Sequence, residues 1–441
     1  MATLNKVVKS APVFTHEGAR AKKITLQKEL ERTVMACMLW EDSFYEEGEA
    51  VADRIKRLVH ALPGHVTSAL AVKARTEMKL RHVPLLMTRE LARHPKVSER
   101  QYVADTLAQV IQRPDELSEY LAIYWKDGKE PLSSQSKRGL AQAFVKFDEY
   151  ALAKYNRDGA VKLRDVLFLS HAKPENKKQE KLFKKVVNNE LKTPDTWEVA
   201  LSGGADKGET FERLIREEKL GALALLRNLR NMEQSGVAKK LIREALKKID
   251  VSRVLPFRFI SAAKYAPDLE PELEQAMFKA LEKMPKLKGK TILLVDNSGS
   301  MYGAPVSAKS EIDRSDAACA LAILLREVCE DVEVLSFSDS PKLVPARRGF
   351  ALREAIKSAT SHGSTNTETA KKLADARGYD RIIIVTDEQS HETITTPNGK
   401  GYVINVANYQ NGLGYGKWIH LDGWSESVVN WIQAYENEGQ D

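Results

Sequence analysis

The chain has 441 residues, of which 43% are hydrophobic, and carries a formal net charge of +7. Because single cores rarely exceed roughly 250–300 residues, this length predicts two or three folded domains. The hydrophobic content is ample for burying cores and argues against wholesale disorder. No run approaches the ~18 apolar residues of a membrane span, and the N-terminus lacks a secretory signal. Three sparse cysteines without CxxC spacing, Cys37, Cys319 and Cys329, predict reduced thiols in a cytoplasm in place of a disulfide framework or a zinc site. We expect no membrane partner, because the sequence has no apolar span.

The charge divides the chain into two unlike parts. Residues 1–285 contain 51 Lys and Arg against 40 Asp and Glu, a net charge of +11. Residues 286–441 contain 17 against 21, a net charge of −4. A basic first part favours a polyanionic partner, most often nucleic acid, although charge alone leaves open a merely solvated, lysine-rich helical surface.

The first part has helical spacing of apolar residues throughout, from about residue 24 to 283. The pattern is clearest in segments 26–40, 103–112, 137–155 and 237–249. Prolines and polar stretches separate these segments, and none of the intervening sequence predicts a strand. So many short helices predict stacked helix pairs of the solenoid kind, although no sequence period is found.

After residue 285, short β-rich runs alternate with helical segments. We expect strands at 291–295, 331–338, 381–387, 401–407 and 418–421, and helices at 315–328, 350–359, 367–377 and 424–436. This alternation predicts a parallel sheet covered by helices on both faces. Ligands of such a sheet bind beyond the carboxyl ends of its strands.

Oxygen-bearing side chains follow two of these strands. Asp296, Ser298 and Ser300 come directly after the first strand, Asp387 ends the strand IIIVTD, and Thr365 lies in the loop HGSTNTETA. Carboxylates with hydroxyls are suited to Mg²⁺ or Mn²⁺ in octahedral geometry with water retained. The alternatives are that Asp296 caps a helix and that Thr365 belongs to an ordinary turn.

Catalytic motifs are poorly supported. The segment Gly289–Thr291 has the end of a phosphate-binding loop, but it precedes its strand and Met284 replaces the required glycine. There is no G-x-S-x-G elbow, and a two-metal nuclease generally needs more clustered carboxylates. We therefore expect no enzymatic activity, with a Mg²⁺-dependent nuclease as the alternative to be tested.

The motif DNSGSM, a later Gly363–Thr365 loop and the strand end Thr386–Asp387 resemble the von Willebrand factor A domain. The resemblance implies a Rossmann-like α/β fold with a metal-ion-dependent adhesion site. The implied ligands are Asp296, Ser298, Ser300, Thr365 and Asp387. Asn366 follows Thr365 where an acidic residue is expected.

Stretches 137–174, 222–232 and 256–262 resemble the TROVE family, which includes the Ro autoantigen and bacterial relatives. The resemblance implies a multidomain chain: residues 1–285 form an all-α, HEAT-like helical repeat ring that binds RNA. Residues 286–441 form the von Willebrand factor A domain that closes the ring around a basic hole. It further implies a monomer that binds small structured noncoding Y RNAs outside and single-stranded 3′ ends of misfolded RNA inside. An exoribonuclease partner and a role in RNA quality control or maturation are also implied.

The resemblance carries the RNA surface onto helix 137–155 and the loop that follows. The candidate contacts are Lys137, Arg138, Lys146, Lys154, Arg157 and His171. Of these, Lys154 and His171 stand at positions that match the family's RNA contacts. The family's second basic residue aligns with Asp158 here, so the neighbouring Arg157 is taken as its substitute. The lysines could instead form a solvated face, and His171 could satisfy helix-end carbonyls. A metal-dependent protein-adhesion module is the alternative function, but it leaves the +11 helical part unexplained.

Overall fold

The computed structural model describes most of the chain. It covers residues 25–36, 48–78, 80–156, 159–252, 254, 256–282, 284, 286–303, 312–390, 392–407 and 416–422, with Val428, Val429, Ile432 and Glu436. None of the described residues before Leu287 lies in a strand, as predicted. Within the described ranges no helix is long and apolar enough to cross a membrane.

Sixteen α-helices precede the sheet in the described part of the chain. They are α1 (Leu26–Ala36), α2 (Gly48–Ala61), α3 (Gly64–Thr76), α4 (His82–Ala92), α5 (Val103–Val110), α6 (Pro114–Tyr124), α7 (Ser134–Phe144), α8 (Glu149–Tyr155), α9 (Leu163–Ser170), α10 (Lys177–Asn188), α11 (Trp197–Ser202), α12 (Lys207–Arg216), α13 (Ala222–Gln234), α14 (Lys239–Lys248), α15 (Pro256–Tyr265) and α16 (Glu270–Leu281). Two 3₁₀ turns, η1 (Val97–Tyr102) and η2 (Pro267–Leu269), accompany them.

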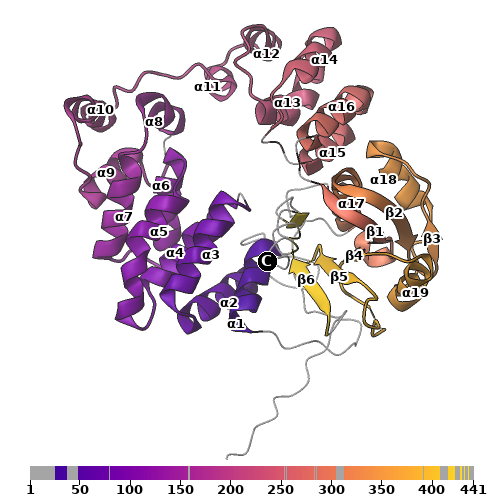
Figure 1. Ribbon diagram of the computed structural model, residues 1–441. Coiled ribbons are helices and arrows are strands. Elements are labelled where there is room, and N and C mark those ends of the chain that lie inside the picture. The colour runs from indigo at the N-terminus through magenta and orange to yellow at the C-terminus, as the bar shows by residue number, and fades with distance from the viewer. Residues whose placement is uncertain are drawn as a thin grey trace, which may run out of the picture.

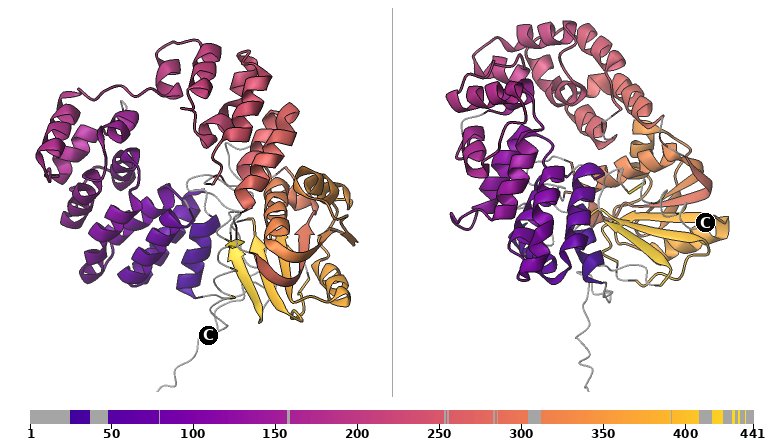
Figure 2. Two further views of the ribbon diagram at one scale, coloured as in Figure 1. Left: turned by 45° about the horizontal axis from the view of Figure 1, so that its top comes forward. Right: turned by 60° about the vertical axis from the view of Figure 1, so that its left-hand side comes forward.

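These helices follow one another along an arc, and the α/β domain lies between the two ends of the arc (Figures 1 and 2). Helix α1 contacts the strand β6 (Trp418–Asp422), while α15 and α16 contact α17 (Arg314–Val328). The chain therefore closes on itself as a ring. The predicted multidomain architecture, a helical-repeat ring with an α/β domain, is confirmed.

The ring contains two hydrophobic cores, and the division between them lies at a different place in the chain from the change in net charge. One core joins α1 to α10, from Leu30 to Val186. A second core begins at Phe211 and runs through α12–α16 into the α/β domain. The predicted boundary between residues 285 and 286 separates α16 from the sheet, but the packing continues across it.

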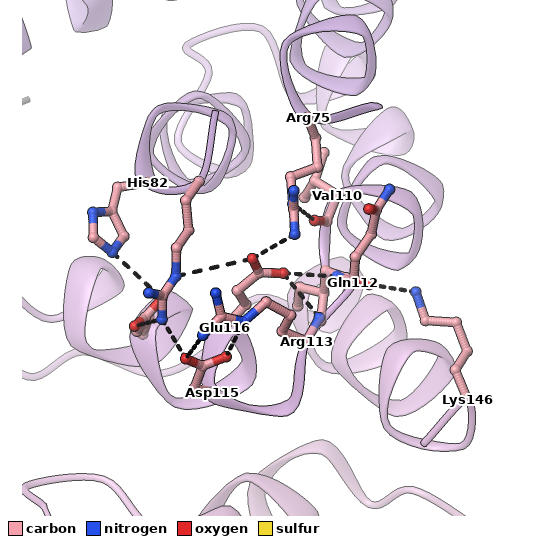
Figure 3. A network of polar contacts seen from close by, with 11 residues as sticks. Arg75, His82, Val110, Gln112, Arg113, Asp115, Glu116 and Lys146 are labelled. Carbon is pink, nitrogen blue, oxygen red and sulfur yellow. Dashed lines mark hydrogen bonds and ion pairs between the residues drawn. The ribbon is translucent and has the colours of Figure 1, made fainter. Parts of the chain in front are cut away.

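A buried ion network strengthens the first core (Figure 3). Arg75 on α3 donates from Nη2 to Glu116 Oε1 at 2.7 Å and from Nε to the Val110 carbonyl at 3.0 Å. The other carboxylate oxygen, Glu116 Oε2, accepts from the backbone N–H of Gln112 at 2.7 Å and of Arg113 at 3.0 Å. The carboxylate thereby caps α6 and links it to α3.

The α/β domain contains a six-stranded sheet in the order β3-β2-β1-β4-β5-β6. Its remaining strands are β1 (Leu287–Asp296), β2 (Cys329–Phe337), β3 (Pro341–Leu343), β4 (Arg381–Thr386) and β5 (Lys400–Asn405). All neighbours pair in parallel except β2 and β3, which are antiparallel. Sequence patterning missed β3, a three-residue edge strand, but correctly predicted the parallel sheet.

Helices cover both faces of this sheet. Leu293 and Val295 of β1 share a core with α17 and α18 (Gly349–Ser358). Ile292 and Leu294 point to the other face and pack with α19 (Thr367–Arg377). Alternate residues of a strand face opposite sides, so a continuous apolar run belongs to a strand covered twice. Most of the helix predicted at 424–436 lies outside the described residues.

The prediction of one helix over 137–155 is wrong. Helix α7 ends at Phe144, and α8 begins at Glu149 after a turn. Asp148 is the N-cap of α8, and its side chain accepts a hydrogen bond from the Ala151 N–H at 2.8 Å. A cap of this kind satisfies an otherwise orphan N–H and so favours a new helix start. Of the RNA contacts predicted on this segment, Lys137 and Arg138 therefore lie on α7, Lys146 in the turn and Lys154 on α8.

Candidate metal centre and nucleic-acid interface

The predicted metal ligands meet at the carboxyl edge of the sheet. Strands β1 and β4 are parallel neighbours, so Asp296 and Asp387 reach the same edge. Their relative exposures are 1% and 0%. Thr386 donates its hydroxyl to Asp296 Oδ2 at 2.6 Å, linking the two strand ends. The strand order changes direction between β1 and β4, which is where parallel α/β sheets usually bind ligands.

The loop after β1 folds back on its own aspartate. The backbone N–H of Ser298 donates to Asp296 Oδ1 at 2.9 Å, and the 3₁₀ turn Gly299–Met301 follows. This curvature brings Ser298 Oγ within 3.3 Å of Ser300 Oγ. The Asp-x-Ser-x-Ser spacing thus places one carboxylate and two hydroxyls on the same side of the loop.

Asn297, between these ligands, faces the other way and anchors the loop. Its backbone N–H donates to the Phe337 carbonyl at 2.8 Å. Its side-chain Nδ2 donates to the Ile356 carbonyl at 3.2 Å and to Thr360 Oγ1 at 2.9 Å. These bonds tie the loop to β2 and to α18, leaving the alternate side chains directed at the candidate centre.

The loop that carries Thr365 lies against the first loop, where the Gly299 N–H donates to the Gly363 carbonyl at 3.2 Å. Asp339 holds this second loop by accepting from the Ser364 N–H at 2.7 Å. A Cβ at Gly363 would come within 1.9 Å of the Asp339 carboxylate, so glycine is required there. Thr365 is buried, and its hydroxyl has no hydrogen-bond partner among the described residues.

Asn366 has a structural reason to replace the expected acid. Its Nδ2 donates to the Asp339 carbonyl at 2.7 Å, a bond that a carboxylate could not make. Its backbone N–H donates to the Ser338 carbonyl at 2.9 Å, and the residue precedes the first turn of α19. The amide thus fastens the Thr365 loop to the end of β2.

The electrostatics of the edge favour a cation. Burial, together with the nearby Asp387 carboxylate, raises the pKa of Asp296 to about 7 and so favours its neutral form. On the other side, Arg314 Nη1 lies 3.3 Å from Asp387 Oδ2. A divalent ion would offset the repulsion between the carboxylates. Lacking such an ion, the edge has two buried acids and one buried guanidinium.

The donor set fits Mg²⁺ or Mn²⁺. It offers two carboxylates and three hydroxyls, all oxygen, which are the ligands these hard cations prefer. The described residues contain no cluster of three or more His, Cys, Asp and Glu, so the site relies on its hydroxyls. Asp296, Ser298, Ser300, Thr365 and Asp387 would hold the ion, which would supply an open coordination position when bound.

The candidate RNA contacts have different environments. Arg138 on α7 is exposed, and Lys137 is partly buried beside it. Lys154, in the last turn of α8, lies over the Tyr155 ring with Nζ 5.8 Å from the centroid. His171 ends α9 in the left-handed conformation, with φ 53° and an exposed side chain. Arg157 lies outside the described residues.

Lys146 is engaged within the protein. Its ammonium group donates to the carbonyls of Ala108 and Ile111 at the carboxyl end of α5 (Figure 3). Burial lowers the pKa of Lys146. Lysines often satisfy the last carbonyls of a helix in this way. This contact favours a structural role over RNA binding. It could not be predicted from the sequence, because both partners are more than 30 residues away.

A stronger basic face was missed by the sequence analysis. Residues 162–192 contain nine Lys and Arg against four Asp and Glu, and most of the basic side chains are exposed. Lys177, Lys178 and Lys181 of α10 and Lys173 before it form no ion pair with any described residue. Lysines at positions i and i+4 lie on one helix face, opposite the buried Phe183 and Val186. That periodicity was readable in the sequence.

Comparison with known proteins finds similarity to the TROVE domain and to two curated proteins. Residues 188–319 match the TROVE domain, a match that starts near the end of α10 and ends within α17. Telomerase protein component 1 of Mus musculus is 37% identical over 89 residues, covering 19% of this chain and 3% of that protein. The corresponding protein of Rattus norvegicus is 36% identical over 89 residues, with the same coverage. The chain thus spans about 3% of the length of these curated relatives.

The fold has a structural counterpart over nearly its whole length. The Ro (RSR) protein of Deinococcus radiodurans superimposes with a TM-score of 0.60 and 18% sequence identity. The alignment covers 93% of this chain and 99% of that one. At this identity the likeness establishes the ring fold with its α/β domain. The TROVE match over residues 188–319 and this likeness of fold agree with the resemblance of the motifs to the TROVE family.

Proposed function

We propose that this chain is a noncatalytic RNA-binding ring protein that binds small structured RNAs of the Y type on its outer helical surface. The match to the TROVE domain supports an RNA partner in general. The observation that carries the finer proposal is the exposed lysine face of α10, within a segment of net charge +5. Phosphate contacts dominate RNA affinity, and exposed lysines outside ion pairs can make them without first breaking internal bonds.

The rest of the ring is suited to a second way of binding RNA. Along the chain, the segment between α10 and α12 links the first core to the second, and the α/β domain closes the ring between the arc ends, where α1 contacts β6 (Figure 1). Such a ring would accept the single-stranded 3′ end of a misfolded RNA at its centre. The cellular role would be RNA quality control or maturation in the cytoplasm, carried out by a monomer with an exoribonuclease partner.

The metal centre would serve recognition. Two carboxylates and three hydroxyls leave a bound Mg²⁺ or Mn²⁺ with coordination positions for an outside ligand. An acidic side chain of a partner protein, such as the exoribonuclease, would complete that shell. A metal-dependent adhesion module acting without RNA remains the second candidate, favoured by the buried Asp296–Asp387 pair.

Substitution of Lys178 and Lys181 by Ala tests the RNA surface. We expect the affinity for a small hairpin RNA to fall about tenfold or more, because two phosphate contacts are lost. The matched control changes two exposed lysines of the acidic domain, Lys288 and Lys342, to Ala. Equal losses in both variants, or no loss in either, would contradict binding through α10.

RNA cleavage tests the noncatalytic part of the proposal. Purified wild type supplied with Mg²⁺ should leave a small RNA intact, and Asp296→Ala should behave identically in that assay. The same substitution should abolish Mn²⁺ binding while preserving hairpin affinity, since the lysine face belongs to the other domain. Cleavage by the wild type that disappears in Asp296→Ala would make the protein a metal-dependent nuclease.

A further inference from the structure

One aromatic side chain of α9 is exposed to solvent close to the lysine face of α10. Phe168 is 58% exposed, whereas every other phenylalanine whose side chain the structure describes is buried or partly buried. Phe183 of α10, for example, packs edge-on against Phe144 with the ring centroids 5.3 Å apart. Phe168 has no such ring contact and no cation over its ring among the described residues. Its ring is therefore available to a molecule outside the chain.

The residues next to this ring on the helix surface are basic. Arg164, Phe168 and His171 occupy positions i, i+4 and i+7, which lie on one face of a helix, and all three are exposed. Val166 and Leu167 belong to the first core and turn the opposite side of α9 inward. His171 ends α9 with φ 53°, and its backbone N–H donates to the Phe168 carbonyl at 3.3 Å. The ring of Phe168 thus lies between two basic residues, one helical turn away on either side.

The basic surroundings extend beyond α9. Helix α9 contacts α10 (Figure 1), and Lys173 follows His171 in the loop between them. Arg164 has one ion pair within the described part of the chain, at 3.8 Å to the adjacent Asp165, and 52% of its side chain is exposed. A polyanion on the lysine face of α10 would therefore meet cations on both sides of Phe168. An apolar protein surface would have to bury these charges, which disfavours it as the occupant.

A second exposed aromatic residue has the opposite surroundings. Tyr150 of α8 is also 58% exposed, but it directly follows Asp148 and Glu149. Glu149 pairs with Lys185 at 2.8 Å, which occupies a lysine that could otherwise contact a phosphate. Single exposed apolar residues are common on protein surfaces and need no ligand to explain them. The cations beside Phe168, and not its exposure alone, therefore suit that ring to nucleic acid.

We propose that Phe168 stacks on an unpaired base of the bound RNA while Arg164 and His171 contact the phosphates on either side. The inference rests on the proposed RNA function and names the part of the RNA that α9 recognises, a nucleotide of a loop or bulge. Bases within a duplex are covered by their neighbours, whereas unpaired bases commonly stack on aromatic side chains. Such a contact accepts any base, because every base has a π-face. Helix α9 would thus favour hairpins and bulged stems over continuous duplexes.

The affinities for two hairpin RNAs test this stacking contact. Both hairpins have the same stem and loop length, but in the second the loop bases are replaced by abasic nucleotides, which keep the phosphates. We expect full-length Phe168→Leu to bind the intact hairpin about tenfold more weakly than wild type does, and the abasic hairpin within about twofold of wild type. The slope of log affinity against log salt should not change, because the ring contacts no phosphate. Tyr150→Leu is the matched control and should bind both hairpins as wild type does.

The outcomes separate the stacking contact from the RNA function on which it rests. If wild type binds neither hairpin, the proposed function fails and the stacking contact with it. If wild type binds but Phe168→Leu binds the intact hairpin equally well, stacking is refuted and the lysine face of α10 stands, which leaves Phe168 to an apolar protein partner. An equal loss on the abasic hairpin, or in Tyr150→Leu, would also overturn the proposal.

A second variant decides should Phe168→Leu not fold. Phe168→Trp keeps a flat aromatic ring, so it should bind the intact hairpin at least as tightly as wild type does. Its added indole fluorescence should be quenched by the intact hairpin and not by the abasic one, after subtraction of the change that wild type shows. Fluorescence that is unchanged on binding the intact hairpin would contradict stacking.

Discussion

Glu116 and Asp296 are buried to the same extent, with exposures of 0% and 1%, but their partners differ. Glu116 has a complete set: the Arg75 guanidinium and two backbone N–H groups. Among the residues that the structure describes, Asp296 receives only the Thr386 hydroxyl and the Ser298 N–H, with another carboxylate close by. A buried charge whose partners are all internal stabilises the fold, whereas one left beside a like charge indicates a place for a ligand.

Removing one partner from the complete set around Glu116 should cause the largest loss of stability. Arg75→Met leaves Glu116 buried without its cation, and removal of one partner of a buried pair typically costs about 3–5 kcal/mol. Urea denaturation should show this loss in the free energy of unfolding of α1–α10. Arg138→Met, at an exposed position, should change it by less than about 0.5 kcal/mol. Similar values for the two variants would mean that the network is not structural.

The incomplete set of partners around Asp296 should make the stability of the protein depend on pH. The folded-state pKa of Asp296 is about 7, above the ordinary value near 3.9, so the folded protein holds its proton more tightly. That stabilisation is full below about pH 4 and is lost as the pH rises through about 7, by up to about 4 kcal/mol. With chelator present, wild type should lose stability relative to Asp296→Asn between pH 5 and pH 8. A constant difference would contradict the raised pKa.

With saturating Mn²⁺, the stability of wild type relative to Asp296→Asn should rise with pH and no longer fall. The ion binds the deprotonated carboxylate, so a rise in pH then increases its affinity and its contribution to stability. Asp296→Asn should gain much less from Mn²⁺ than wild type. Thermal melts at pH 8 with and without Mn²⁺ measure this; an equal gain in both proteins would place the ion elsewhere.

A lysine with internal partners should differ from a lysine facing solvent. Lys146→Ala removes hydrogen bonds to the end of α5, so we expect a loss of about 1 kcal/mol in unfolding free energy and unchanged RNA affinity. Urea denaturation and hairpin binding should be measured on the same sample. Weaker RNA binding without a stability change would reverse the assignment.

The smallest expected effect is that of Lys154→Ala. Its ammonium lies near the Tyr155 ring with no ion pair to a described residue, so stability should change by less than about 0.5 kcal/mol. Loss of one phosphate contact should weaken hairpin binding about threefold. An unchanged affinity would remove α8 from the RNA surface.

Much of the candidate metal centre could be predicted, because most of its residues follow predicted strands at short spacing in the sequence. Asp296, Ser298 and Ser300 follow a strand at fixed spacing, and Asp387 ends a neighbouring strand. The position of Arg314 beside Asp387 could not be predicted, because 73 residues separate the two in the sequence. Asp339, which holds the Thr365 loop, is equally invisible in the sequence, because its partners follow 22 to 27 residues later.

The helical part was predicted less completely. Helical periodicity continued across the turn at 145–148 and hid the break, although Asp148 is an ordinary capping residue. Division of the cores between α10 and α12 could not be read from charge, because charge reports surfaces and the cores depend on packing. The short edge strand β3 has too few residues for a periodic signal.

The salt dependence of RNA binding tests the central claim most directly. If wild type neutralises about four phosphates of a hairpin through its helical surface, log affinity should fall with log salt at a slope of about −3.6. Affinity would then decrease about 100-fold between 50 and 200 mM salt. The double variant Lys178→Ala with Lys181→Ala should make the slope shallower by the contribution of about two phosphate contacts. An affinity that is the same at both salt concentrations would contradict RNA binding by the basic ring.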